Sequence, residues 1–348
     1  MDRIKIVADS NIPFLEGVFE PYADIRYVDG QDIRREDIVD ADVLLIRTRT
    51  RCDAALLDGT RVSMIATATI GTDHIDEEYC RRRGILVHNA KGCNAGGVMQ
   101  YVFSALYGTA SRKSLKLSPG DVMGIIGVGN VGSRVERMAR HIGFSVLRCD
   151  PPRAQREGPE GFCSLEHLLL NSKIVTLHVP LDDTTRDMAD ETFFNLIRPG
   201  AFFINTSRGE TVVEEALMDA LPKLGPVIID TWRNEPHINR ELLDAVDIAT
   251  PHIAGYSRQG KQNGTASVVR AVARRFGISP LLDFYPVDDV PESRPVHLDL
   301  RGMNQGEITS VLQYNYPIFT DDFMLRLQPD DFERLRSEYC YRREISID

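Results

Sequence analysis

The sequence of 348 residues predicts an α/β protein with two doubly wound parallel-sheet domains and a small C-terminal α+β domain. Short apolar runs alternate with helical patterns along most of the chain, which is typical of parallel strands joined by helices. This alternation stops after Pro280, and prolines then punctuate the sequence. We therefore expect one domain at 1–93 and 257–280, a second inserted at 94–256, and an assembly domain at 281–348.

Composition narrows the classes of function. The chain is 43% hydrophobic and 26% charged, as in ordinary globular proteins, and its formal net charge of -10 disfavours nucleic acid as a partner. We find neither an apolar run of membrane-spanning length nor the apolar core of a signal peptide. The six cysteines form no Cys-x-x-Cys pair, so we expect free thiols, no bound metal and a cytoplasmic location.

The first domain is predicted from buried strands that end at polar residues. In parallel sheets, ligands bind beyond the carboxyl ends of the strands. Thr48 and Thr69 lie just past two such ends, and a helix is expected around Asp53–Leu57. The predicted strands are Ile4–Ala8, Val43–Ile46, Met64–Ala68 and Ile85–His88.

A long helix at Asn94–Ser111 is expected to lead into the second domain, because its apolar and small residues recur three and four apart. A buried strand at Val122–Ile126 then opens a new alternation, with helices expected at about 131–142, 164–170, 190–195 and 212–221. The later strands are expected at Ser145–Arg148, Ile174–His178, Ala201–Asn205, Val227–Ile229 and Asp247–Ala249.

A glycine-rich turn follows Val122–Ile126 and predicts a dinucleotide site. Gly127, Gly129 and Gly132 have G-x-G-x-x-G spacing, which permits a tight turn, close approach of a pyrophosphate and close packing of helix on strand. Asp150 follows the next strand, 23 residues beyond Gly127, where a carboxylate binds ribose hydroxyls and repels a 2′-phosphate. This favours NAD over NADP, although Asp150 also suits the start of a turn and the nearby Arg153 leaves the preference open.

Three later strands each end at a residue suited to 2-hydroxy acid chemistry: Arg208, Glu235 and His252. An arginine binds a carboxylate through two hydrogen bonds, and a histidine accepts the proton of an alcohol as hydride leaves. A glutamate bonded to the imidazole fixes its tautomer. Taken singly, each residue also suits a surface turn or an ion pair, but their common setting at strand ends predicts a catalytic set.

These segments resemble the D-isomer-specific 2-hydroxyacid dehydrogenases over about the first 280 residues. The resemblance implies a Rossmann-type NAD domain inserted in a flavodoxin-like substrate domain, with Arg208, Glu235 and His252 catalytic. One departure is Val179, where the family usually has a threonine near the nicotinamide. The cofactor-binding residues that we expect are Gly127, Gly129, Asn130, Val131, Gly132, Asp150, Val179, Thr206, Ser207, Arg208, Asp230 and Gly255.

Further segments, among them 66–74, 149–153 and 341–345, resemble one branch of this family, whose members act on 4-phospho-D-erythronate in pyridoxal 5′-phosphate (vitamin B6) biosynthesis. The resemblance implies a cytoplasmic homodimer held by the C-terminal domain and substrate contacts from Thr48, Thr69 and Tyr256. A phosphate needs a cation, for which Arg47 is our first candidate.

Other assignments stay open at this point. Arg49 and Arg51 are alternatives to Arg47, and Arg342 and Arg343 are candidates for reaching the site of a neighbouring subunit. The alternative functions are a dehydrogenase for phosphoglycerate, glyoxylate or another 2-hydroxy acid, and an NAD-sensing protein without enzymatic activity. The intact set of Arg208, Glu235 and His252 argues against the last.

Overall fold

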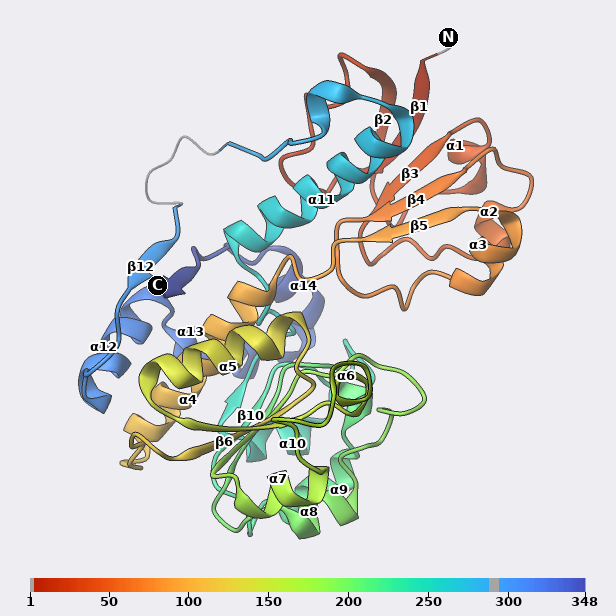
Figure 1. Cartoon of the computed structure of the whole chain (residues 1–348). Coiled ribbons are helices and arrows are strands. Elements are labelled where there is room, and N and C mark those ends of the chain that lie inside the picture. Colours follow the sequence, from red (N-terminus) through yellow and green to blue (C-terminus); the bar gives the residue numbers. More distant parts are fainter. Residues whose placement is uncertain (1–2, 288–293, 348) are drawn as a thin grey trace. The chain divides into compact units, whose positions relative to one another are not determined.

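The computed structural model describes residues 3–287 and 294–347. The chain divides into two compact units: unit 1 comprises Met1–Asn94 and Arg258–Ser293, and unit 2 comprises Ala95–Ser257 and Arg294–Asp348. Each unit contains one large sheet, and Figure 1 follows the chain through them by colour. The fold class is the predicted one, α/β with two doubly wound parallel sheets.

The sheet of unit 1 is entirely parallel, with the strand order β2-β1-β3-β4-β5. Alternate strand residues face opposite sides: Val43 and Leu45 pack with helix α11, whereas Leu44 and Ile46 pack on the other face. Both faces are thus covered, as parallel sheets require. The elements are β1 (Ile4–Asp9), β2 (Ala23–Val28), α1 (Arg35–Ile38), β3 (Val43–Ile46), α2 (Ala54–Leu57), β4 (Met64–Thr67), α3 (Glu77–Arg83), β5 (Leu86–Asn89), α11 (Arg258–Phe276) and η2 (Ser279–Leu281).

The sheet of unit 2 is also entirely parallel, with the order β7-β6-β8-β9-β10-β11. Helices α4 and α5 pack on one face, and helices α7 to α10 pack on the other. The elements are α4 (Ala95–Arg112), β6 (Val122–Ile126), α5 (Asn130–Ile142), β7 (Ser145–Cys149), α6 (Pro151–Glu157), α7 (Leu165–Asn171), β8 (Ile174–Leu177), α8 (Glu191–Leu196), β9 (Phe202–Asn205), η1 (Gly209–Thr211), α9 (Glu214–Ala220), β10 (Val227–Ile229), α10 (Arg240–Ala245) and β11 (Ile248–Ala249).

The C-terminal residues belong to unit 2 and are not set apart as a third compact unit. Helix α4 is buried along nearly its whole length, so it needs cover on the side away from the sheet. Ile308, Leu312 and Ile345 provide that cover, because they share one apolar core with α4. The elements of this segment are β12 (Val296–Leu298), α12 (Gln305–Asn315), α13 (Ile318–Leu327), η4 (Pro329–Asp331), α14 (Phe332–Ser337) and β13 (Ile345–Ile347), with β12 and β13 paired in parallel.

The predicted strands all form, within about two residues of their expected ends. Strand β2 was not predicted; its alternation of buried and exposed residues suits its place at the sheet edge. Helices α6 and α10 were not predicted either, and α6 begins directly after Asp150, where a turn was the alternative. Within residues 3–287 and 294–347, no helix has the length and apolar character needed to cross a membrane.

Candidate active site

The three candidate catalytic residues follow three neighbouring strands of unit 2. Arg208 follows β9, Glu235 follows β10 and His252 follows β11, and these strands are paired in that order. Because the strands are parallel, the loops that carry these residues lie at the same carboxyl edge of the sheet. The glycine-rich turn after β6 lies at this edge too.

Glu235 and His252 form a hydrogen-bonded pair. Nδ1 of His252 lies 2.8 Å from Oε2 of Glu235, while Oε1 of Glu235 accepts a hydrogen bond from the backbone N–H of Trp232 at 2.9 Å. Burial acts to raise the pKa of Glu235, but the charge and hydrogen bond of His252, the Trp232 N–H and the charge of Arg336 together lower it below its ordinary value. An ionised Glu235 places the proton of a neutral imidazole on Nδ1, which leaves Nε2 as an acceptor.

The loop that carries His252 is held by Asp230. His252 has a left-handed backbone conformation, with a φ of 55°, which costs a non-glycine residue about 1–3 kcal/mol and persists only where its surroundings hold it. The buried carboxylate of Asp230 accepts hydrogen bonds from Thr250 Oγ1 and from the N–H groups of Ile253 and Ala254, at 2.7 to 3.0 Å. Burial raises the pKa of Asp230 despite these donors. The described contacts thus give Asp230 a role in shaping the loop.

Arg208 lies in a turn whose polar groups bond to one another. Asn205 Oδ1 accepts hydrogen bonds from the N–H and the hydroxyl of Ser207, and Thr211 donates to the carbonyl of Arg208 at 2.6 Å. The next residue, Gly209, packs directly on the following loop, because a Cβ there would overlap the backbone of Trp232. Through Gly209 the turn of Arg208 therefore contacts the loop of Glu235. Gly209 follows Arg208 directly in the sequence but was not predicted as a functional residue.

The glycine-rich turn has the space that a pyrophosphate requires. Gly127 has a φ of +82°, and a Cβ there would lie 2.7 Å from the carbonyl oxygen of His178. A Cβ at Gly132 would overlap the Gly127 carbonyl, so α5 packs closely on the turn. At Gly129, by contrast, a Cβ would meet no atom within 4 Å, and Gly129 and Asn130 are exposed where α5 begins. The free end of this 13-residue helix fits an anionic group.

Asp150 joins the end of β7 to this turn. One carboxylate oxygen accepts a hydrogen bond from Val128 N–H at 2.8 Å, and the other caps α6 through Arg153 N–H at 2.9 Å. The Arg153 side chain donates to the Val128 carbonyl at 2.7 Å and pairs with Glu157. Asp150 therefore lies beside the glycine-rich turn, and it also begins a short helix.

The residues after β8 and β9 meet at His178. Its two ring nitrogens lie 3.0 Å from Thr176 Oγ1 and 3.2 Å from Thr206 Oγ1. Burial lowers the pKa of His178 to about 3, so the ring is neutral at physiological pH. Val179 also packs on Gly127, because a Cβ there would lie 2.9 Å from a methyl group of Val179. Val179 thus contacts the turn directly and Thr206 contacts the neighbouring His178, close to the point between β6 and β8 where the strand order changes direction.

The C-terminal segment contacts the loop after His252. The ring of Tyr256 packs edge-on against Tyr339 and Tyr341, with centroids 6.1 and 6.2 Å apart. The Arg336 side chain bonds to the Tyr256 side chain and acts electrostatically on Glu235. Arg342 donates to backbone carbonyls of the same loop. The expectation that Arg342 reaches a neighbouring subunit is therefore wrong for this residue, whose guanidinium is engaged within its own chain.

The predicted substrate residues Arg47, Thr48 and Thr69 lie in unit 1, past the carboxyl ends of β3 and β4. Arg47 donates to the carbonyl of Asn11 at 3.0 Å. It lies near the point between β1 and β3 where the order of the strands along the parallel sheet changes direction. Thr69 Oγ1 lies 2.7 Å from Thr67 Oγ1, and Thr48 is exposed. The two alternative cations have other surroundings than Arg47. Arg51 pairs with Asp53, and Arg49 is exposed.

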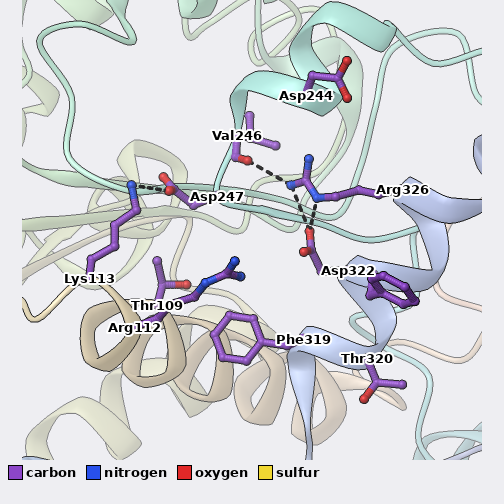
Figure 2. A pocket seen from close by; sticks show the side chains of 11 residues that line it. Thr109, Arg112, Lys113, Asp244, Val246, Asp247, Phe319, Thr320, Asp322 and Arg326 are labelled. Atoms are coloured by element: carbon purple, nitrogen blue, oxygen red, sulfur yellow. Dashed lines mark hydrogen bonds and ion pairs between the residues drawn. The ribbon is translucent and has the colours of Figure 1, made fainter.

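A pocket of about 710 Å³ lies elsewhere in unit 2, among α4, α10 and α13 (Figure 2). Its charged groups are largely paired with each other: Lys113 with Asp247, and Arg326 with Asp322. Asp247 directly precedes β11, so the pocket lies at the amino edge of the sheet, opposite the candidate catalytic residues. Among residues 3–287 and 294–347, no cluster of three or more His, Cys, Asp or Glu could hold a metal ion.

Comparison with known proteins places this geometry in a family. Residues 104–254 match the family model described as D-isomer specific 2-hydroxyacid dehydrogenase, NAD binding domain. An erythronate-4-phosphate dehydrogenase from Bacteroides fragilis is 42% identical over 98% of this chain and 97% of the relative. The enzyme of the same name from Yersinia pestis is 40% identical over 99% of this chain and 93% of the relative.

Solved structures show the same fold. The TT0316 protein from Thermus thermophilus has a TM-score of 0.68 at 24% identity, over 79% of this chain and 97% of that one. An NAD-bound 3-phosphoglycerate dehydrogenase from Entamoeba histolytica has a TM-score of 0.67 at 24% identity, over 83% of this chain and all of that one.

Proposed function

The chain belongs to the D-isomer specific 2-hydroxyacid dehydrogenase family, in its erythronate-4-phosphate dehydrogenase branch, and we propose from this membership that it oxidises 4-phospho-D-erythronate to 2-oxo-3-hydroxy-4-phosphobutanoate with NAD. The reaction is a step of pyridoxal 5′-phosphate biosynthesis. The observation that carries the proposal is the pair of Glu235 and His252, 2.8 Å apart at the sheet edge that also carries the glycine-rich turn.

NAD supplies the hydride acceptor when it is bound. The open space at Gly129 and the exposed beginning of α5 fit its pyrophosphate, and Asp150 fits the adenosine ribose. The other residues proposed to hold NAD are Gly127, Asn130, Val131, Gly132, Val179, Thr206, Ser207, Arg208, Asp230 and Gly255.

We assign the proton to His252 and the substrate carboxylate to Arg208. Nε2 of His252 accepts the proton of the C2 hydroxyl as the C2 hydride leaves, so the alcohol becomes a ketone and the imidazole becomes an imidazolium. Glu235 then stabilises that charge through Nδ1. Arg208 binds the carboxylate through two parallel hydrogen bonds and so orients C2. The reverse reaction returns the proton from His252.

The phosphate of the substrate is assigned to unit 1. Arg47 lies beside the point between β1 and β3 where the strand order changes direction, and ligands bind at this point in open parallel sheets. Thr48 and Thr69 follow neighbouring strands and supply hydroxyl groups, and Tyr256 of unit 2 is proposed as a fourth substrate residue. The carbonyl of Asn11 keeps the Arg47 guanidinium at the end of its strand.

We also propose that the protein is a cytoplasmic homodimer assembled through its C-terminal helices. Tyr314, Phe323 and Leu327 are large apolar side chains on α12 and α13 that are 82%, 60% and 58% exposed. Exposed apolar residues gathered in one segment are typical of interaction surfaces. The six cysteines form no disulfide bond with one another, as expected for a reducing compartment.

The proposed function is tested by NADH formation. Purified protein is mixed with NAD and either 4-phospho-D-erythronate, 3-phosphoglycerate, glycerate or lactate, and absorbance at the NADH band is followed. We expect the highest kcat/KM with 4-phospho-D-erythronate. A higher kcat/KM with another of these acids would show that this acid is the substrate instead. NAD binding without turnover of any of them would contradict the proposed dehydrogenase activity.

A further inference from the structure

The guanidinium of Arg342 binds the loop that follows His252. Its Nη2 donates to the carbonyl of Ala254 at 2.7 Å, and its Nη1 donates to the carbonyl of Tyr256 at 3.0 Å. Longer contacts reach the carbonyls of Ile253, at 3.4 Å, and Gly97, at 3.3 Å. One planar group therefore ties the loop to itself and to the beginning of α4, which a point charge such as an ammonium cannot do.

The guanidinium is in turn fixed from its other side. It stacks on the ring of Tyr316, 3.7 Å from the centroid, and Nη1 also lies 3.1 Å from the Tyr339 hydroxyl. Tyr316 is 2% exposed and belongs to the core around α4. The carboxyl group of Asp321, to which the Tyr339 hydroxyl donates at 2.9 Å, adds a negative charge nearby. Arg342 thus connects a rigid core to the loop.

The neighbouring residues join the same two segments. Ser257 pairs with Arg342 as an isolated parallel bridge, and its hydroxyl donates to Glu344 at 2.6 Å in a buried contact. Gly96 at the beginning of α4 has no room for a Cβ, because Glu344 fills that space. The loop from His252 to Ser257 is therefore held along its length by residues 342–344.

We propose that Arg342 is a positioning residue for proton transfer, which holds the loop of His252 and Tyr256 in its reactive conformation. This inference rests on the proposed function. The left-handed conformation of His252 needs support from its surroundings, and Asp230 supplies it from the sheet while Arg342 supplies it from the C-terminal segment. The C-terminal segment is thereby part of the catalytic apparatus as well as a candidate for assembly.

The experiment compares Arg342→Lys with wild type, using NAD and 4-phospho-D-erythronate with hydrogen or deuterium at C2. We expect kcat to fall about tenfold to hundredfold, since displacement of a reacting group by about 1 Å has an effect of this size. We also expect a larger deuterium isotope effect, because a misplaced base makes hydride transfer rate-limiting. Arg334→Ala is the matched control: this exposed arginine on α14 pairs with Asp331, and its loss should change neither quantity.

A second variant separates positioning from folding. Arg342→Ala leaves a space for a free guanidinium, so we expect ethylguanidinium to restore part of its kcat and ethylammonium at equal concentration to restore none. A wild-type kcat in Arg342→Lys would overturn the inference. A second result would also overturn it: a lower kcat in both variants, with no rescue of Arg342→Ala by ethylguanidinium and no change in the isotope effect of Arg342→Lys. That pattern would mean only that fewer molecules are folded. An inactive wild type would overturn the proposed function itself, together with this inference.

Discussion

Nδ1 of His252 lies 2.8 Å from Oε2 of Glu235, and the two residues come from loops after adjacent parallel strands. The other carboxylate oxygen of Glu235 accepts the backbone N–H of Trp232, so Glu235 is itself fixed. The carboxylate therefore sets both the tautomer and the direction of the imidazole. Without it, a neutral histidine has no preference for leaving Nε2 free.

The pair predicts non-additive losses of activity. His252→Asn removes the proton acceptor and should lower kcat/KM by about 10²–10⁴-fold. Glu235→Gln should lower it less, and the double variant should be no worse than His252→Asn alone, because both residues serve one proton transfer. Steady-state kinetics with NAD affinity measured separately tests this. Losses that multiply in the double variant would mean that the residues act independently.

Arg208→Lys should impair turnover although it keeps the charge. A lysine cannot form two parallel hydrogen bonds to a carboxylate, and hydrogen bonds to charged groups contribute about 1.5–3 kcal/mol each. We expect kcat/KM to fall by roughly tenfold to a hundredfold, the equivalent of one such bond. Arg198→Lys on the exposed loop before β9 is the control. Near-normal kcat/KM in Arg208→Lys would exclude a bidentate role.

Asp150→Asn should weaken the preference for NAD. The substitution keeps the size of the side chain but removes the charge that binds ribose hydroxyls and repels a 2′-phosphate. We expect NAD affinity to fall by about tenfold or more, as for one charge-assisted hydrogen bond, while NADP affinity falls less or rises. Calorimetric titration with both nucleotides measures this. Glu157→Gln, which removes the charge of the carboxylate paired with the Arg153 side chain, should leave NAD affinity unchanged.

Local patterns in the sequence explain why much of the fold and site could be predicted. Val122–Ile126 is buried on both faces of its sheet, so it reads as a continuous apolar run, and the glycines that follow have steric requirements visible in their spacing. Strand ends with Arg208 and His252 were recognised in the same way. In each case, neighbours in sequence determine the local structure, and the parallel topology then brings the ends together.

Contacts between distant segments could not be predicted in this way. Arg342 lies 88 residues beyond Ala254, and no local pattern indicates that its guanidinium bonds to that carbonyl. The packing of residues 294–347 with α4 likewise depends on the uncovered side of a helix two hundred residues earlier. The contact of Gly209 with Trp232 could not be predicted for the same reason, although the two residues are closer in sequence, because it depends on how two loops meet.

Gly209→Ala tests the contact between the loops of Arg208 and Glu235. A methyl group there overlaps the backbone of Trp232, so one of the two loops must move. We expect kcat to fall by about 10²-fold, the effect of a displacement of about 1 Å, with the unfolding free energy lowered as well. Gly306→Ala on α12 is the control, because the new methyl group meets only the Asn304 side chain. An unchanged kcat in Gly209→Ala would show that the loops tolerate separation.

His178 predicts a loss of stability on acidification. Burial lowers its pKa from 6.5 to about 3, so the unfolded chain binds a proton in this range and the folded protein does not. The unfolding free energy therefore falls as the pH drops below 6.5 and continues to fall until about pH 3. Between pH 7 and pH 5 this group alone should remove about 1–2 kcal/mol.

Urea unfolding of wild type and His178→Gln at a series of pH values isolates this contribution, since all other groups titrate in both proteins. The difference in unfolding free energy should shift in favour of the variant as the pH falls from 7 to 5. His167→Gln serves as the control, because this exposed histidine on α7 has no comparable burial. A difference between wild type and His178→Gln that stays constant over this range would mean that His178 takes up its proton at the same pH in the folded and the unfolded protein, so that burial does not lower its pKa.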